Sequence, residues 1–522
     1  MLRIDPASLD WALAHARKYG DTDVFPLPFE YDAIHHNWDE LRDYLSSQDV
    51  LGWEVRPHRS LLAPKAKYGF RVITQLDPLD FLLFAAIVFE MARDLEDARV
   101  APANLRVFSY RYNPDPDGRL FDPTIGYPKY QSVCRAILDR HDEFTHVVTT
   151  DISDFYCRIY HHRLENALNA STSKANHVKA VKHLLSGWNG TETFGIPVGS
   201  APSRLLAEIA ISDVDEALLA NGVRFIRFND DFRIFATSHS EAYRQLAFLA
   251  EVLFRNHGLT LQQQKTTVLP TPVFRQRYLS DPEDRELDSL QERFSALLRD
   301  LGISDPYQEI DYDDLSNEAK ATIDSMNLVS MFEEEADDDE PDLPTLRFLL
   351  RRLGQLGDSD IVDVVLGNLD KLHPVFPDII RYLSNLRDLG PERRSEIGGS
   401  VLRLLEDSII SELDYHRLWA LDLFSKNTDW NNEQSFFQLL QTVGSRPGQR
   451  KIILAMGRAH QRHWFQSQWR NLFDEPPWSR RALLAAASCM PPDARKHWYR
   501  SLGGRLDALE NAIARWARQN PF

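Results

Sequence analysis

Three aspartates are the residues whose type and spacing could support metal-assisted chemistry. Asp151 ends the β-branched run THVVTTD, and Asp230 and Asp231 lie between two apolar halves of residues 223–236. Carboxylates that converge from different strands can hold two divalent cations about 4 Å apart, and phosphoryl transfer is the usual reaction of such sites. Adjacent acids in a turn are more often simply solvated, so the Asp-Asp pair alone does not establish a function.

The elements around these aspartates are predicted to be a mixture of helices and strands. Residues 145–151 have the pattern of a short strand, and residues 223–236 that of two strands around an Asn-Asp turn. The flanking elements are predicted by apolar periodicity and by proline and glycine boundary signals: helices over 75–98, 202–220 and 240–257, and a strand near 266–269. Residues 1–60 are predicted to contain a helix followed by an extended stretch.

Composition places the chain among globular proteins with several domains. It has 522 residues, of which 43% are hydrophobic and 26% charged, and this balance excludes a disordered, fibrous or disulfide-stapled chain. The longest apolar run, 81–89, is shorter than the roughly 18–20 residues of a membrane span, and the N-terminus lacks a signal pattern. The three scattered cysteines have no metal-ligand spacing. The sequence predicts a cytoplasmic protein with no membrane partner.

The net charge of −17 is concentrated in one segment. Residues 281–340 contain 4 Lys and Arg against 21 Asp and Glu, whereas residues 341–522 have a net charge of +4. An acidic block is usually solvated or serves as an interaction surface. The overall charge therefore does not exclude a nucleic-acid partner for the rest of the chain.

Apolar residues at helical spacing dominate residues 345–522, which predicts a stack of helical pairs without a strict repeat period. This region also contains arginines close to tryptophans. The combination suits single-stranded nucleic acid, and it equally suits packing between helices with arginines at the surface. The residues concerned are Arg462, Trp464, Trp469, Arg470, Trp478, Arg480 and Arg481.

The segments around the aspartates resemble the ordered motifs of reverse transcriptases. TTDISDFYCRI resembles motif A, GIPVGSAPSRLLAEI motif B, RFNDDFRIF motif C and GLTLQQQKT motif D, while PKAKYGFRVITQLDPLD resembles the upstream fingers motif. The order A, B, C, D and the spacing are those of a polymerase palm. With YGDTDVFPLPFE before these motifs and a helical array after them, the whole chain resembles the bacterial abortive-infection and defence-associated reverse transcriptases.

This resemblance implies an α+β fold, with reverse transcriptase-like right-hand fingers and palm followed by an all-α, repeat-like C-terminal domain. It predicts four segments along the chain: an N-terminal extension at 1–60, fingers and palm at 61–275, an acidic connecting segment at 276–344 and a helical domain at 345–522.

The resemblance further implies a DNA polymerase that adds dNTPs by two-metal phosphoryl transfer. The expected cofactor is a pair of Mg²⁺ ions, for which Mn²⁺ could substitute. Asp151 and Asp230 would bridge both ions, Asp231 would support one, and the backbone carbonyl of Ile152 would complete the ligand set.

Basic residues are expected at the nucleotide's phosphates. Arg71, assisted by Lys65 or Lys67, would contact the triphosphate of the incoming nucleotide. Lys265 would give a proton to the departing pyrophosphate. The plainer alternative for each is an ordinary surface cation.

The remaining expected roles concern the nucleotide's sugar and the template. Tyr156 would exclude the ribose 2′-hydroxyl, unless it is a core aromatic, and Gly199 would let the backbone approach the nucleotide, unless it is a simple loop residue. Asn229 replaces the usual Ala, Val or Met of motif C and is compatible with a tight turn. Ser200 replaces a larger or amide side chain at the template contact, which puts ordinary template use in doubt.

The biological role implied by the resemblance is antiphage defence by abortive infection, with untemplated or protein-primed synthesis as one mode. The expected partners are dNTPs, the DNA product, an RNA template or noncoding RNA, and further copies of the chain in a homo-oligomer. The alternative is a reverse transcriptase-like scaffold or sensor that binds RNA or nucleotides with little catalysis. The three intact aspartates favour an active enzyme.

Overall fold

The computed structural model describes residues 1–66, 68–279, 327–338, 341, 343–426, 428–430, 432–468 and 472–522. Lys67, Trp469, Arg470 and most of the predicted acidic segment lie outside this described part. The chain folds as two compact units, the first formed by Met1–Ser60 with Val72–Ser280 and the second by Leu61–Arg71 with Asp281–Phe522. This division differs from the four predicted segments, because the N-terminal residues fold with the palm.

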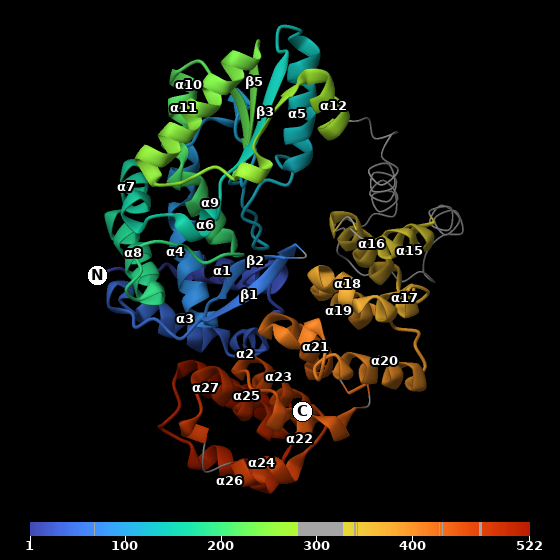
Figure 1. Cartoon of the computed structure of the whole chain (residues 1–522). Helices are drawn as coiled ribbons and strands as arrows, with labels where there is room; N and C mark the ends of the chain where they lie inside the picture. Colours follow the sequence, from blue (N-terminus) through green and yellow to red (C-terminus); the bar gives the residue numbers. More distant parts are fainter. Residues whose placement is uncertain are drawn as a thin grey trace. The chain divides into compact units, whose positions relative to one another are not determined.

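The first unit is built of helices around one sheet (Figure 1). Its helices are α1 Pro6–Tyr19, α2 Glu30–His36, α3 Trp38–Ser47, α4 Pro78–Asp97, α5 Tyr127–Arg140, α6 Phe155–Arg158, α7 His161–Ser171, α8 Ala175–Asn189, α9 Ala201–Ala210, α10 Ser212–Ala220, α11 His239–His257 and α12 Thr271–Tyr278. Its sheet strands are β3 His146–Asp151, β4 Arg224–Phe228, β5 Asp231–Ala236 and β6 Thr267–Pro270. The predicted mixture of α and β elements around the aspartates is confirmed.

Two sequence predictions for this unit need correction in detail. Residues 20–29, directly after α1, form neither helix nor strand, and the N-terminal stretch then continues as the helices α2 and α3, which bury Ile34 and Leu45. Residues 202–220 are not one helix, because Ile211 leaves the helical conformation with φ −119° and Ser212 starts a second helix. Apolar periodicity continues through that break, so it gave no warning of it.

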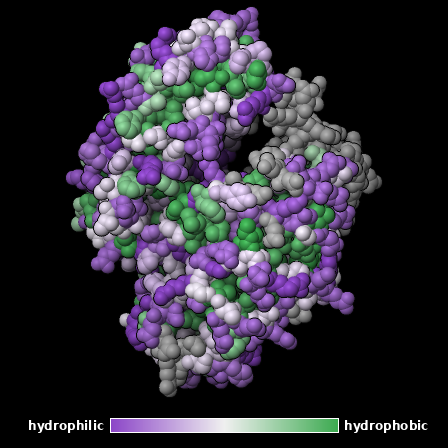
Figure 2. All heavy atoms as spheres, viewed as in Figure 1, coloured by the Kyte–Doolittle hydropathy of each residue, from purple (hydrophilic) through white to green (hydrophobic). Residues whose placement is uncertain are grey.

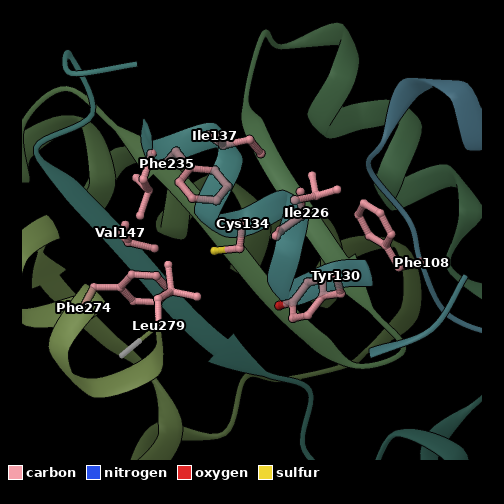
Figure 3. Packing of buried hydrophobic residues seen from close by; sticks show 11 residues of the cluster. Phe108, Tyr130, Cys134, Ile137, Val147, Ile226, Phe235, Phe274 and Leu279 are labelled. Atoms are coloured by element: carbon pink, nitrogen blue, oxygen red, sulfur yellow. The ribbon is translucent and has the colours of Figure 1, made fainter. Parts of the chain in front are cut away.

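The sheet has the strand order β4-β5-β3-β6, and all its pairings are antiparallel. Side chains of α5 and α12 pack with inward-facing residues of the strands in one buried cluster (Figure 3). Cys134 and Tyr130 of α5 lie in this cluster with Val147 of β3 and Phe235 of β5. Because β3 and β5 are central and packed along their length, the ends that carry the aspartates have a rigid support.

A separate two-stranded hairpin is formed by β1 Arg59–Ala66 and β2 Gly69–Gln75. This is the segment expected to be the fingers motif. Its tip, Leu61–Arg71, belongs to the second compact unit. The start of β1 and the end of β2 belong to the first unit.

The second unit is otherwise helical, as predicted. Its helices are α15 Leu328–Asp337, α16 Leu343–Leu356, α17 Val362–Gly367, α18 Leu369–Leu372, α19 Phe376–Asn385, α20 Pro391–Arg403, α21 Asp414–Lys426, α22 Glu433–Thr442, α23 Arg446–Arg458, α24 Arg462–Gln468, α25 Pro477–Ala486, α26 Pro492–Ser501 and α27 Ala508–Gln519. Contacts join α16, α19, α21, α23, α25 and α27 in succession. The array is therefore a continuous stack, while its description as a repeat stays a prediction.

Among the described residues, two of the arginines close to Trp478 serve for packing. Trp478 and Arg481 are buried, and the guanidinium groups of Arg481 and Arg450 lie 4.4 and 5.3 Å from the Trp478 ring centre. Arg480 forms an ion pair with Glu510 at 3.3 Å. Of the two interpretations given for these residues, packing between helices therefore applies to Trp478 and Arg481, because the Arg481 side chain does not reach the surface.

No helix in the described part of the chain combines the length and the apolar character needed to cross a bilayer. Hydrophilic residues cover most of the face seen in Figure 2, and hydrophobic residues form scattered groups among them. The prediction that the sequence contains no membrane span is in agreement with this finding.

The buried His15 makes the stability of the first unit depend on pH. Its Nδ1 lies 2.7 Å from the carbonyl of Gly118, and burial lowers its pKa from 6.5 to about 4. The unfolded chain therefore binds a proton that the folded chain does not, so stability should fall as the pH drops from 6.5 towards 4. The loss expected from this group is about 3 kcal/mol.

Urea unfolding between pH 7 and pH 4.5 would test this expectation in His15→Gln, with the exposed His162→Gln as the control. The His15 variant should lose less stability on acidification than the wild-type protein and the control. An identical pH dependence in all three proteins would contradict the assignment.

Candidate active site

The pairing of β3 with β5 determines where two of the predicted aspartates lie. Asp151, the last residue of β3, is directly opposite Asp231, the first residue of β5. Side chains at such paired positions share a face, with Cβ atoms about 4.5–5.5 Å apart. Asp230 precedes β5 in the turn, and its carbonyl accepts a 3.1 Å hydrogen bond from the amide of Ile152. The structure thus brings all three aspartates to one end of the sheet.

Asn229 shapes the turn that carries Asp230. Its φ is +55°, in the left-handed region, where Asn is among the residues most easily accommodated. Its side-chain amide donates to Asp230 Oδ1 at 2.8 Å, and its backbone amide donates to Ser109 Oγ at 2.7 Å. An apolar residue at this position could not make the first of these bonds. The unusual Asn229 therefore fits both the turn conformation and the orientation of Asp230.

A buried ionic network supports the turn from below. Arg227 donates to Asp215 at 2.8 Å, pairs with Glu208 at 3.0 Å and donates to the carbonyl of Asn229 at 2.8 Å. Ser109 Oγ also bonds Glu208, at 2.5 Å. Glu208 lies on α9, the helix of the motif B segment, and Asp215 lies on the next helix, α10. Both helices are therefore tied to the motif C turn through one arginine.

The charges of this network are balanced. Arg99 pairs with Glu208 at 2.7 Å and with Glu96 at 3.0 Å, and Arg111 pairs with Glu96 at 3.0 Å. Three arginines are thus matched with three carboxylates, which is the condition under which buried charges are tolerated. Sequence reasoning did not predict any of these residues. The one local signal was the charged Arg227 within the apolar run VRFIRFNDDF.

The site concentrates negative charge away from water. Burial, and then the neighbouring charge of Asp151, raises the pKa of Asp230 from 3.8 to about 7. Burial also raises the pKa of Asp231 to about 6, with Asp151 adding to the effect and Arg233 opposing it. Oδ1 of Asp151 is buried and has no hydrogen-bond partner among the described residues. A carboxylate oxygen left in this state is a suitable ligand for a hard divalent cation.

Lys265 provides the positive charge at this site. Its ammonium group donates to Oδ2 of Asp151. Burial would lower the pKa of Lys265, but the hydrogen bond to Asp151 and the charges of the three aspartates raise it overall. Across the described residues, no three His, Cys, Asp or Glu side chains are grouped as a ready metal site. The donor set fits a cation, whereas its present arrangement is that of carboxylates paired with a lysine.

Two backbone hydrogen bonds fix the motif D segment beside β3. The amide of Gln262 donates to the carbonyl of Asp151 at 2.7 Å, and the amide of Ser153 donates to the carbonyl of Thr260 at 2.9 Å. Neither bond uses the carbonyl of the buried Ile152, the expected backbone ligand. The short helix Gln263–Lys265 follows directly, which explains how Lys265 reaches Asp151.

Tyr156 lies beside the turn that carries Asp230. Its hydroxyl donates to Asn229 Oδ1 at 3.3 Å, and burial raises its pKa well above 10. The adjacent Phe155 is the more deeply buried ring, and the two ring centres are 5.5 Å apart. The position of a core aromatic is therefore taken by Phe155, while Tyr156 faces the residues around Asp230.

The structure shows a packing role for Gly199 and a capping role for Ser200 that the sequence did not indicate. Gly199 has φ +107°, and a Cβ there would lie 3.0–3.1 Å from side-chain atoms of Thr22, Asp23 and Val24. Its carbonyl also accepts from the amide of Asp23 at 3.2 Å. Ser200 caps α9 with its side chain. The close approach at Gly199 is thus by the N-terminal YGDTDV segment.

The same N-terminal segment contributes to a pocket above the motif B loop. Arg204 of α9 pairs with Asp23, and its guanidinium lies 5.3 Å from the ring centre of Tyr110. His15, Asp23, Gly199 and Arg204 are among the residues that line the pocket. Sequence reasoning placed the YGDTD segment in a separate extension and missed this contact.

Lys65 and Arg71, expected at the triphosphate, are exposed residues of the hairpin tip in the second unit. The geometry of the first unit neither includes nor tests them, so their role stays a prediction.

Residues 98–280 match the family model described as reverse transcriptase (RNA-dependent DNA polymerase). The matched range includes the three aspartates, the whole four-stranded sheet and Lys265. Over this range the chain is similar to a reverse transcriptase domain, the domain of RNA-directed DNA polymerases, which are nucleotidyltransferases.

Two solved telomerase structures resemble the chain remotely. The telomerase of Candida albicans, in complex with a TWJ fragment of telomeric RNA, is 11% identical with a TM-score of 0.33, and the match covers 70% of this chain and 64% of that one, less than two thirds of its length. The apo telomerase of Candida tropicalis is 12% identical with a TM-score of 0.33, and the match covers 81% of this chain and 74% of that one. No curated protein matches the chain. The domain assignment rests on the family model.

Ser109→Ala should slow nucleotide incorporation by the reverse transcriptase domain. The change removes the acceptor of the Asn229 amide and one donor to Glu208, and an unsatisfied buried amide costs about 1–3 kcal/mol. If the turn shifts and even part of this energy is lost from the stabilisation of the transition state, kcat should fall about tenfold. The measurement is the incorporation of labelled dNTP into polymer, alongside the melting temperature.

Ser171→Ala is the matched control, because Ser171 Oγ bonds only the Ala167 carbonyl of its own helix. The control should retain the wild-type rate. If Ser109→Ala lowered the melting temperature and left kcat unchanged, the network would support the fold and have no role in positioning Asp230.

Proposed function

We propose that this chain is an active DNA polymerase that adds dNTPs by two-metal phosphoryl transfer, with Asp151, Asp230 and Asp231 as the metal ligands. The observation that carries the proposal is the meeting of three carboxylates, the buried Asp151 and the half-buried Asp230 and Asp231, at one end of the sheet, where the charge of Asp151 raises the pKa of the other two. The unpartnered Oδ1 of Asp151 supports it. Divalent cations would relieve both the repulsion and the unmet oxygen.

In this proposal Asp151, Asp230 and Asp231, together with the carbonyl of Ile152, would hold two Mg²⁺ ions, or Mn²⁺ in their place. When bound, the ions activate the attacking hydroxyl and stabilise the charge on the leaving pyrophosphate. The hydroxyl oxygen bonds the α-phosphorus, the bond to pyrophosphate breaks, and the hydroxyl proton is released. The protein's own task is to position these groups.

Lys265 has two successive roles in the proposed cycle. Without a nucleotide, its ammonium group balances Asp151. With the site loaded, Lys265 leaves Asp151 and donates a proton to the departing pyrophosphate. A lysine is protonated at neutral pH without any such partner, so it can still supply the proton after it leaves Asp151.

The proposed nucleotide contacts follow from the resemblance of each segment to a reverse transcriptase motif. Tyr156, held at Asn229, blocks the space of a ribose 2′-hydroxyl, and the backbone at Gly199 borders the nucleotide. Arg71 and Lys65 contact the triphosphate, as the resemblance of the hairpin to the fingers motif implies.

We further propose that synthesis serves antiphage defence by abortive infection and takes place in the cytoplasm, in an untemplated or protein-primed mode. The N-terminal YGDTD segment packs on the motif B loop, and Ser200 there acts as a helix cap, which supports an unusual use of the template region. An RNA template or noncoding RNA and assembly into a homo-oligomer belong to the same proposal.

The alternative function is a scaffold or sensor that binds RNA or nucleotides with little catalysis, in which Lys265 would stay paired with Asp151. The two functions predict different results for the metal-ligand variants.

Asp151→Asn and Asp230→Asn should each reduce dNTP incorporation by several orders of magnitude, because a neutral amide neither holds the cations nor balances their charge. The melting temperature should not fall, since each change removes a repelling charge from a buried cluster. Incorporation assays with Mg²⁺ and thermal unfolding measure both effects. Asp154→Asn, at an exposed motif A position, is the control and should keep full activity.

Retained incorporation in either variant would overturn the polymerase mechanism. Failure of the wild-type protein to incorporate any nucleotide, with or without supplied primer and template, would instead favour the scaffold function.

Tyr156→Ala should weaken the preference for dNTPs over rNTPs, because the ring that borders the 2′-hydroxyl is lost. Tyr156→Phe retains the ring and loses only the bond to Asn229, so it should keep the preference. The ratio of kcat/KM for dTTP and UTP measures the effect. An unchanged ratio in Tyr156→Ala would assign Tyr156 a structural role.

A further inference from the structure

A surface cavity in the first unit has no part in the chemistry described above. It has a volume of about 270 Å³ and is lined by residues of α7, α10 and the end of α11, with further residues from the ends of α4 and α9 (Figure 1). This volume is several times the roughly 30 Å³ that one water molecule takes in the liquid, and it lies just below the range of typical small-molecule sites. The cavity is therefore large enough for a small organic molecule.

One side of α7 forms a wall of this cavity. The residues of the wall recur at intervals of three and four positions and therefore share one side of the helix. They are Arg163, Asn166, Ala167 and Ala170. Leu164 and Leu168 lie on another side of the helix and are buried in the fold. Arg163 is exposed and has neither a hydrogen bond nor an ion pair with any residue in the described part of the chain.

A second wall comes from α10 and carries the opposite charge. Asp213 and Glu216 lie three residues apart on this helix, so they are neighbours on its surface. Asp215 lies between them in sequence, is buried, and accepts from Arg227 at 2.8 Å on the side of the ionic network. Glu216 is exposed, and no described residue pairs with it.

The opposite charges of the two walls do not neutralise each other directly. Arg163 forms no ion pair with Asp213 or Glu216 among the described contacts, although all three residues line the cavity. A ligand with one anionic and one cationic group could contact both walls at once. A ligand with a single charge would leave one wall without a counter-charge.

His257 is the most buried polar residue of the lining, with only 9% of its surface exposed. Its Nε2 donates to Oδ1 of Asp213 at 2.8 Å, and its Nδ1 has no hydrogen-bond partner among the residues that the structure describes. In the neutral ring Nδ1 is then an acceptor. With the carboxylates of Asp213 and Glu216 it provides three acceptors, which match the three N–H donors of an ammonium group.

We propose that this cavity binds a free amino acid with a small apolar side chain. The carboxylate of the ligand is bound by the guanidinium group of Arg163, with the amide of Asn166 as a second donor. The ammonium group is bound by Asp213, Glu216 and Nδ1 of His257. The side chain of the ligand lies against the alanines of the lining, which are Ala98, Ala167, Ala170 and Ala210.

Isothermal titration calorimetry on the full chain tests the proposal with L-alanine, L-valine and L-leucine as probes. At least one of them should bind saturably. The methyl ester of that amino acid lacks the carboxylate charge, and its N-acetyl derivative lacks the ammonium group. Each derivative should bind about tenfold more weakly or worse, because hydrogen bonds to a charged group are lost.

Two variants assign each charge of the ligand to its wall. Arg163→Gln should weaken binding of the free amino acid about tenfold or more, and it should bind the amino acid and its methyl ester alike. Glu216→Gln should weaken binding and reduce the discrimination against the N-acetyl derivative. Arg140→Gln and Glu54→Gln, at exposed positions outside the cavity, are the matched controls and should bind like the wild-type protein.

The proposal would be overturned if none of the three amino acids bound the wild-type protein, or if both blocked derivatives bound as tightly as the free amino acid. Wild-type affinity in both cavity variants would overturn it as well. Calorimetric binding requires no nucleotide incorporation, so the result holds whether or not the proposed polymerase function does.

Discussion

Arg227 has no exposed surface, and removing a guanidinium group from water costs several kcal/mol unless acids and carbonyls surround it. Glu208 of α9, Asp215 of α10 and the carbonyl of Asn229 supply those partners. None of the three can move without leaving a buried charge unmatched. Because the turn at Asn229 carries Asp230, the position of the Asp230 carboxylate follows from the charge balance between Arg227 and the acids of α9 and α10.

The carboxylate cluster and its surroundings have opposite electrostatic character. Below the turn, acids and arginines match one another and hold the backbone in place. At the end of the sheet, the charge of Asp151 raises the pKa of Asp230 and Asp231, while Lys265 and Arg233 offset part of this negative charge. A site held this way is rigid in its backbone and unsatisfied in its ligands, which is the arrangement that favours a cation on arrival.

Local patterns in the sequence were enough to predict the parts of the site that are local in the chain. Alternating apolar residues, the Asn-Asp turn and the stop at Gly258 indicated β3, β4, β5 and α11. Arg227 pairs with acids 12 and 19 positions away through space, and no periodicity reports such partners. For the same reason, the packing of Thr22 and Asp23 on Gly199, and the membership of the hairpin tip in the second unit, became visible only in the fold.

The central claim is that the three aspartates form a divalent-cation site at which Lys265 is replaced on loading. Titration of the full chain with Mn²⁺ in the presence of dTTP, followed by electron paramagnetic resonance, counts the bound ions directly. The account predicts two tightly bound Mn²⁺ ions per chain in the wild-type protein and a loss of tight binding in Asp230→Asn. Equal binding by both proteins, or no binding by the wild-type protein, would contradict it.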